Sequence, residues 1–341
     1  MAELTISSGG SPQPQRSAAL SPALNAVFQE KVVQRIMFDQ RTQSALLDWQ
    51  ARFPGEDVRW FHFPLGVPFN EVRESVLLKG RADFTVGDPL LNLSAEDKVL
   101  LYAYSNMRRH IGTLRHVLSK HEHLFRRTLF GEYCATVVDI GCGPYTGALG
   151  IADFLSSGAG PAEFQYRGVD IAGPMLALGK SLLSGAIEKK VLSGVQGWKA
   201  STGMAAFPHA EPHTWLSREG GSVCFVFSHL FASETLDPGA LSFWVNQIVD
   251  RLPHVPMAIL MTNSSHELSK GKWRAFQSGL SGFSVIDSAE TERFAFNGET
   301  KLAECSYAIL GRHLPGQLIA EPPRSLEDLS TVLRREKGEV K

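Results

Sequence analysis

The chain has 341 residues, 43% hydrophobic and 20% charged, so it can bury a core and is not a mostly disordered protein. The 34 Lys and Arg residues nearly balance the 35 Asp and Glu residues, which excludes a global attraction to nucleic acid or to an anionic membrane. No apolar run reaches the roughly 18 residues of a membrane span, so we expect no membrane partner.

The four cysteines predict a reducing compartment. They form no CxxC pair, and three of them stand inside apolar runs: Cys134, Cys142, Cys224 and Cys305. Buried, reduced thiols are expected, with neither a disulfide framework nor a metal site. The first 20 residues lack the basic start and apolar stretch of a signal peptide. We therefore expect a cytoplasmic protein.

The first 130 residues divide into a polar leader and a helical region. Residues 1–20 are rich in Ser, Gly, Pro and Gln, which predicts a disordered leader. Residues 21–130 are predicted to form a helical cap that serves as a substrate domain. The helix signals are a Ser21-Pro22 start, a capping box at residues 94–97 and a helical pattern over 108–129.

Residues 131–315 alternate short apolar runs with helix-like stretches, which predicts an α/β domain with a mostly parallel, seven-stranded sheet covered on both faces. The predicted strands are Thr136–Ile140, Phe164–Ile171, Val195–Ala200, Val223–Phe227, Met257–Met261, Phe283–Ile286 and Leu302–Leu310. The predicted helices cover 146–157, 174–186, 239–251 and 267–278. The turn signal Asn297-Gly298 joins the last two strands into an antiparallel edge hairpin. Residues 316–341 form a charged C-terminal tail.

A glycine loop follows the first predicted strand. The segment 137–147 reads VVDIGCGPYTG, in which an apolar strand runs into glycines that open a helix. Glycine lets the backbone approach a ligand closely. Thr146 stands where a dinucleotide fingerprint has its third glycine, which argues against a pyrophosphate on the helix N-terminus.

Two acids stand at the ends of the first two strands. Asp139 precedes the loop by two residues, and Asp170 ends the second strand. Ligands bind beyond the carboxyl ends of parallel strands, and a carboxylate there can accept both hydroxyls of a ribose. A ligand with an amino acid at one end and a nucleoside at the other would satisfy both acids.

These residues carry a resemblance to a known family. DIGCGPYTG at 139–147, followed by GVDI at 168–171, resembles the first two motifs of the class I S-adenosylmethionine-dependent methyltransferases. The predicted strands with their closing hairpin also resemble the Rossmann-like sheet of that family, over about residues 131–312. Residues 1–130 carry no such resemblance.

The resemblance implies S-adenosylmethionine as the methyl donor, bound over Gly141 and Gly143, with Asp139 near its methionine part and Asp170 on its ribose. The residues that it makes candidates for donor binding are Asp139, Gly141, Cys142, Gly143, Asp170, Ile171, Ser201 and Ser228. The alternative is a purely structural role, in which the glycines make only a tight turn and the acids only cap helices.

The fourth strand predicts a catalytic candidate. His229 follows that strand at the cleft, where a neutral imidazole can take a proton from a nucleophile. A histidine in this role is expected to titrate at its ordinary pKa of about 6.5. The alternative is a histidine that only shapes the pocket by hydrogen bonding. The Asn/Asp-Pro-Pro-Tyr motif of enzymes that methylate the amines of DNA bases is absent here, which disfavours that reaction.

Positive charge is concentrated on the predicted helix over residues 108–127. Its cations are Arg108, Arg109, Arg115, Lys120, Arg126 and Arg127, with histidines at 110, 116, 121 and 123. This helix is a candidate for RNA or for an acidic substrate, against the alternative of a solvated face. His121 and His123 point apart on a helix, so no metal site is predicted.

The leading interpretation is a methyltransferase that acts on an oxygen or nitrogen of a small molecule or natural-product intermediate held under the helical cap. Two alternatives stay open: methylation of RNA or protein, and a non-catalytic binding or scaffold protein that keeps the fold. The identity of the acceptor, the methylated atom and the oligomeric state are not readable from the sequence.

Overall fold

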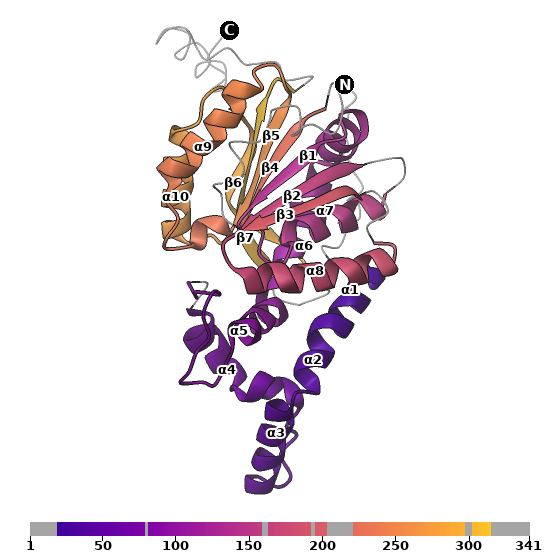
Figure 1. Cartoon of the computed structure of the whole chain (residues 1–341), viewed down its shortest axis with the longest axis vertical. Coiled ribbons are helices and arrows are strands. Elements are labelled where there is room, and N and C mark those ends of the chain that lie inside the picture. The colour runs from indigo at the N-terminus through magenta and orange to yellow at the C-terminus, as the bar shows by residue number, and fades with distance from the viewer. Residues whose placement is uncertain are drawn as a thin grey trace, which may run out of the picture.

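A computed structural model of the chain describes residues 19–78, 81–158, 163–191, 195–202, 221–296 and 302–314, with only the backbone described over 195–202 (Figure 1). The predicted leader up to residue 18, the Asn297-Gly298 turn, the side chain of Ser201 and the tail at 316–341 lie outside the described residues.

A seven-stranded sheet forms the centre of the α/β part, in the order β3-β2-β1-β4-β5-β7-β6. The strands are β1 (Thr136–Ile140), β2 (Phe164–Asp170), β3 (Val195–Thr202), β4 (Val223–Ser228), β5 (Met257–Asn263), β6 (Ser284–Phe294) and β7 (Ala303–Arg312). The first five strands pair in parallel, and β7 runs antiparallel to both β5 and β6. The predicted mostly parallel sheet with an antiparallel pair at one edge is therefore found.

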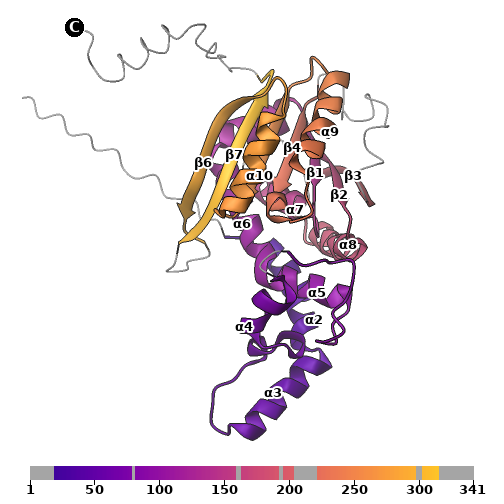
Figure 2. The same ribbon diagram turned by 90° about the vertical axis from the view of Figure 1, so that its left-hand side faces the viewer.

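Helices cover both faces of this sheet, because its strands are apolar on both sides. In β1, Val137 belongs to one apolar core and Val138 to the other, as the two-residue period of a strand requires. The helices α9 and α10 pack on the Val138 face, while α7 and α8 lie on the opposite face (Figures 1 and 2). Their bounds are α7 (Thr146–Ser156), α8 (Gly173–Glu188), α9 (Pro238–Arg251) and α10 (Glu267–Ser278).

The edge strand β6 is longer than the predicted run Phe283–Ile286. It extends to Phe294, and most of its side chains are exposed or half-buried. An exposed edge strand needs no continuous apolar run. Polar residues follow Ile286, so the hydrophobic pattern predicted only the first part of the strand.

The N-terminal region is helical, as predicted, and packs against one end of the α/β part (Figure 2). Its α-helices are α1 (Pro22–Phe28), α2 (Gln34–Met37), α3 (Gln40–Arg52), α4 (Phe69–Glu71), α5 (Ala95–Tyr102) and α6 (Arg108–Lys120). Helical segments of the 3-10 or π type are η1 (Gln29–Val33), η2 (Trp60–His62), η3 (Pro64–Gly66), η4 (Val72–Val76), η6 (Ala103–Met107), η7 (His123–Glu132) and, after β4, η10 (Leu230–Ala232). None of the described helices has the length and apolarity needed to cross a bilayer.

The two predicted helix starts are confirmed. Ser21 Oγ accepts the amide hydrogen of Leu24 at 3.2 Å. In the capping box, Ser94 Oγ accepts from the Asp97 amide at 3.1 Å, and Asp97 Oδ2 accepts from the Ser94 amide at 2.9 Å. The predicted single helix over 108–129 is wrong, because α6 ends at Lys120 and the chain turns at His121 before η7.

Apolar side chains join the helical region to the α/β part. One continuous core contains Phe28 of α1, Leu114 of α6, Leu149 of α7 and Val137 of β1. The helices α1 and α5 contact α8, and α6 contacts α7. The helical region is thus fixed against the sheet by a shared core.

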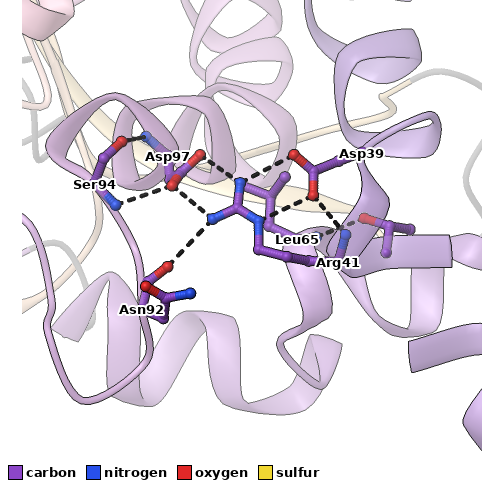
Figure 3. A network of polar contacts seen from close by, with 7 residues as sticks. Asp39, Arg41, Leu65, Asn92, Ser94 and Asp97 are labelled. Atoms are coloured by element: carbon purple, nitrogen blue, oxygen red, sulfur yellow. Dashed lines mark hydrogen bonds and ion pairs between the residues drawn. The ribbon is translucent and has the colours of Figure 1, made fainter. Parts of the chain in front are cut away.

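Arg41 links the start of α3 to the start of α5 (Figure 3). Its guanidinium donates to both carboxylate oxygens of Asp97 at 2.8 Å, to Asp39 at 2.9 and 3.0 Å, and to the carbonyl of Asn92 at 3.2 Å. Because Asp97 also closes the capping box, one cation connects two helix N-termini.

Replacing Arg41 with methionine should destabilise the helical region. The variant keeps an apolar stem but leaves two carboxylates without their cation. The Arg41 side chain is 32% exposed, so solvent screens part of the attraction. We expect a loss of about 1–2 kcal/mol in the free energy of unfolding, measured by urea denaturation at pH 7. The control is Arg59→Met, whose exposed pair with Asp57 should contribute little.

The effect of Arg41→Met should also depend on pH. Burial opposes the shift, but the hydrogen bonds from Arg41 hold the pKa of Asp97 below its ordinary value of 3.8. The carboxylate therefore stabilises the fold above that value, and its contribution disappears as the pH falls through the lower folded-state pKa. The difference between wild type and variant should shrink in acid; a difference that stays constant with pH would contradict this account.

Candidate functional site

The loop between β1 and α7 has a backbone that only a few residue types adopt easily. Gly141, Gly143 and Tyr145 have φ angles of 66°, 53° and 60°. The amides of Gly141 and Cys142 both donate to the carbonyl of Val169, at 2.8 and 3.1 Å, which fixes the loop to the end of β2. A Cβ at Gly141 would lie 2.6 Å from Leu230 Cδ1, a methyl group at the end of its side chain that would have to shift, and the positive φ itself favours glycine there.

Asp170 stands at the end of β2 and holds this loop from the other side. Its Oδ2 accepts the amide hydrogen of Gly143 and its Oδ1 that of Ala172, both at 2.8 Å. Each carboxylate oxygen has a second lone pair, so the side chain can still accept from a ligand. Burial raises the pKa of Asp170, although the backbone amides oppose that shift.

Asp139 does not reach the ligand side of the loop, which corrects the expectation from sequence. It is fully buried, and its Oδ2 accepts a hydrogen bond from Tyr166 at 2.8 Å. Asp139 is two residues from Val137 and shares its side of β1, the side covered by α7. Burial raises the pKa of Asp139 to about 7. This acid supports the loop from beneath.

A cavity of about 1150 Å³ opens above the loop, between the carboxyl ends of the strands and the N-terminal helices. Six of the residues predicted from the sequence line it: Gly141, Gly143, Asp170, Ile171, Ser228 and His229. Asp139 and Cys142 are buried and do not line it. Ligand binding at this edge of the sheet agrees with the rule for open parallel sheets.

A pair of stacked imidazoles forms one wall of the cavity. His229 follows β4 with a φ of 60°, and its amide donates to the carbonyl of Thr262 at 2.7 Å. Its ring stacks on that of His110 from α6, with 3.5 Å between centroids and 14° between planes. The hydroxyl of Tyr102 lies 3.1 Å from His110 Nδ1.

Both imidazoles are neutral at physiological pH. Burial, aided by the charge of Arg109, lowers the pKa of His229 to about 3. Burial and the neighbouring His229 hold the pKa of His110 well below 6.5. His229 Nε2 has no hydrogen-bond partner within the described part of the chain, so a ligand in the cavity can supply one.

The sequence analysis missed His110, although a signal for it was present. Cavity-lining polar residues recur from the end of α5 through η6 into α6, at positions 102, 106, 109, 110 and 113, so that most of them have another three or four residues away. This spacing places them on one helix face. The prediction considered only the net charge of the segment, so it did not separate the residues on this helix face from the others.

The cations of residues 108–127 do not form one basic face. Arg115 lies 2.8 Å from the buried carboxylate of Asp153, and Arg126 donates to the carbonyls of Phe154 and Leu155. Lys120 donates to the hydroxyl of Tyr307 at 2.7 Å. Three of the six cations are therefore engaged with other groups of the chain, although Lys120 stays partly exposed, and this weakens the case for an RNA-docking helix.

The cysteine and metal expectations can be compared with the described residues. All four cysteines are buried and none forms a disulfide. No group of three or more His, Cys, Asp or Glu side chains within the described ranges is arranged to hold a metal ion.

No protein-family model and no curated protein matches the chain. Among solved structures, the chain is similar to the mitomycin 7-O-methyltransferase, with 14% identity, 86% of this chain and 76% of that chain covered, and a TM-score of 0.38. It is similar to magnesium protoporphyrin IX methyltransferase from Synechocystis PCC 6803, solved with bound S-adenosylmethionine, with 13% identity, 74% and 93% covered, and a TM-score of 0.34. The corresponding values for fibrillarin from Aeropyrum pernix are 16%, 52%, 66% and 0.28.

The sheet order, the antiparallel closing pair and the glycine loop after the first strand agree with the Rossmann-like fold that the sequence resemblance implied.

Gly147 is expected to be indispensable to the buried acid beneath the loop. A Cβ at this position would overlap Oδ2 of Asp139. Gly147→Ala should therefore cost about 1–3 kcal/mol in the free energy of unfolding, the usual range for overpacking. Gly271→Ala in α10 is the matched control, because nothing lies within 4 Å of its Cβ, and it should gain about 0.5–1 kcal/mol. Equal effects of the two substitutions in urea denaturation would contradict this account.

Proposed function

We propose that the protein is an S-adenosylmethionine-dependent methyltransferase that transfers a methyl group to an oxygen or nitrogen atom of a small molecule. The observation that carries this proposal is the Asp170 carboxylate beside a positive-φ glycine loop, both on the wall of a large cavity. A ribose has two hydroxyls that can donate to the carboxylate oxygens of Asp170. The loop leaves room for the ligand to lie close to the backbone.

Further residues on the same wall fit this donor. Ile171 follows Asp170 and is 73% exposed, so a large apolar side chain is uncovered where the adenine of the donor would lie. Ser228 lines the cavity at the end of β4 and offers a hydroxyl. We assign donor binding to the backbone of Gly141 and Gly143 and to the side chains of Asp170, Ile171 and Ser228.

The size of the cavity supports a reaction between two ligands. Small-molecule sites usually measure about 300–1,000 Å³. A cavity of about 1150 Å³ exceeds that range, which favours a donor and an acceptor held side by side. We propose residues 21–130 as the acceptor-binding cap and 131–315 as the donor-binding domain.

A donor held by Gly141, Gly143 and Asp170 would supply a methyl group on a positively charged sulfur, so that the acceptor atom could form a bond to the methyl carbon while the carbon–sulfur bond breaks and its electron pair leaves with the sulfur. The protein must align the nucleophile and exclude water, which can contribute more than strong acid–base help. The helices η6 and α6 form the wall opposite the glycine loop. His229 is a weak base, because its pKa is about 3, so we propose that Nε2 orients the nucleophile by a hydrogen bond.

The alternatives from other classes differ in measurable ways. A non-catalytic scaffold would bind the donor but give no methylated product with a broad panel of acceptors. An RNA methyltransferase would bind RNA with a steep dependence on salt. Turnover of a small hydroxyl or amine acceptor supports the proposal over both.

Asp170→Asn should weaken donor binding. The variant removes the negative charge and replaces one acceptor oxygen with an amide nitrogen. S-adenosylhomocysteine should bind at least about tenfold more weakly in calorimetry, because a hydrogen bond to a charged group contributes about 1.5–3 kcal/mol. Asp88→Asn, outside the cavity, is the control, because an Asn side chain can still accept from the Leu90 amide. Unchanged affinity in a folded Asp170→Asn protein would remove Asp170 from the donor site.

His229 should stay neutral across the physiological pH range. With a pKa of about 3, its ring should show no titration between pH 5 and 8 in histidine-detected NMR, with the signal assigned by its loss in His229→Asn. The lowered pKa means that the unfolded chain binds the proton first, so His229 favours folding above about pH 6.5 and this contribution declines in acid. A midpoint near 6.5 would restore the general-base interpretation made from the sequence.

A further inference from the structure

The charged side chains on the cavity wall leave two cations without partners. Five acids line the cavity, and each is engaged: Asp83 accepts from Thr85, Asp170 from Gly143 and Ala172, Glu234 from Arg81, Asp237 from Gly239 and Ala240, and Glu304 from Ser265 and Arg293. Of the three arginines on the wall, Arg81 is paired with Glu234. Arg73 and Arg109 have no side-chain hydrogen bond or ion pair among the described residues.

Arg109 is the uncommitted cation that lies next to the stacked histidines in the sequence. It precedes His110 in α6, and its charge contributes to the lowered pKa of both His110 and His229. It also acts on the thiol of Cys305 in β7. The charge of Arg109 therefore acts on His229, which follows β4, and on Cys305 in β7.

This position separates Arg109 from the proposed ribose site. In the sheet order β3-β2-β1-β4-β5-β7-β6, Asp170 ends β2, whereas Cys305 lies in β7, beyond β5. The donor is proposed to lie over the β1 and β2 side, so the volume beside Arg109 is the volume left for the acceptor.

We infer that the methyl acceptor carries a carboxylate and that Arg109 binds it beside His229. This inference rests on the proposed function. A guanidinium presents a planar fork of donors that matches a carboxylate with two parallel hydrogen bonds. Arg109 is exposed on this wall, so a ligand that enters the cavity can reach its guanidinium, and hydrogen bonds between two charged groups are stronger than those between neutral groups. An anionic acceptor would also supply the partner that Arg109 lacks.

The donor has a carboxylate of its own, and the first experiment separates the two sources. Calorimetry compares S-adenosylhomocysteine with 5′-methylthioadenosine, which lacks the amino acid end, on wild type and Arg109→Gln. We expect both ligands to bind the variant within twofold of wild type. A selective loss of S-adenosylhomocysteine affinity in Arg109→Gln would assign Arg109 to the donor and overturn the inference.

The second experiment tests the acceptor side with matched probes. Indole-3-acetate and indole-3-acetamide, and cinnamate and cinnamamide, are titrated by ligand-detected NMR into protein saturated with S-adenosylhomocysteine. Each acid should bind wild type at least fivefold more tightly than its amide, and Arg109→Gln should abolish that preference. Arg127→Gln, which removes an exposed arginine of η7 outside the cavity, should retain it.

Acids that bind no better than their amides, including pairs in which neither binds, would overturn the inference. The same holds for an acid preference that survives in Arg109→Gln. If wild type does not bind S-adenosylhomocysteine, the proposed function fails; the comparison of acid and amide without it still reports on Arg109, so the two failures are distinguishable.

Discussion

The carboxylate of Asp170 ties together the two segments that leave the sheet after β1 and β2. It accepts one amide hydrogen from Gly143 and one from Ala172, so the backbone fixes its position before any ligand arrives. The glycine loop is then held on both sides, by this carboxylate and by the Val169 carbonyl. Because the Asp170 carboxylate is already held in place, it loses little conformational freedom when a ligand binds, which favours affinity for a ligand whose hydroxyls donate hydrogen bonds to it.

The helical region matters to the site because it packs against the sheet through a shared apolar core. Its apolar residues share one core with α7 and β1, and the Arg41 network fixes the starts of α3 and α5 relative to each other. His110 of α6 therefore stacks on the ring of His229, which follows β4. The stacked pair is a contact between the two parts of the chain, and its geometry depends on both.

Much of the fold could be predicted from the sequence, because β1, β4 and β5 are buried on both faces and appear as short apolar runs. The exposed edge strand β6 carries no such run, so its length was underestimated. Asp139 was expected at the ligand only because it lies near the end of its strand. The alternation of side chains along a strand already placed Asp139 on the same face as Val137, away from the ligand. Contacts between residues far apart in the sequence could not be predicted, because no local pattern connects Arg115 with Asp153 or His110 with His229.

The electrostatics of the cavity relate the proposed donor to the inferred acceptor. The proposed donor would bring a positive sulfur into a cavity whose wall already carries Arg109, and two like charges repel each other. Neutral imidazoles at His110 and His229 avoid adding a third and a fourth positive charge, and burial keeps them neutral. A carboxylate on the acceptor would offset the charge of Arg109 and make it easier for the cavity to hold the sulfonium. Transfer would then remove the positive charge from the sulfur, so any repulsion that remains between the donor and Arg109 would fall as the reaction proceeds.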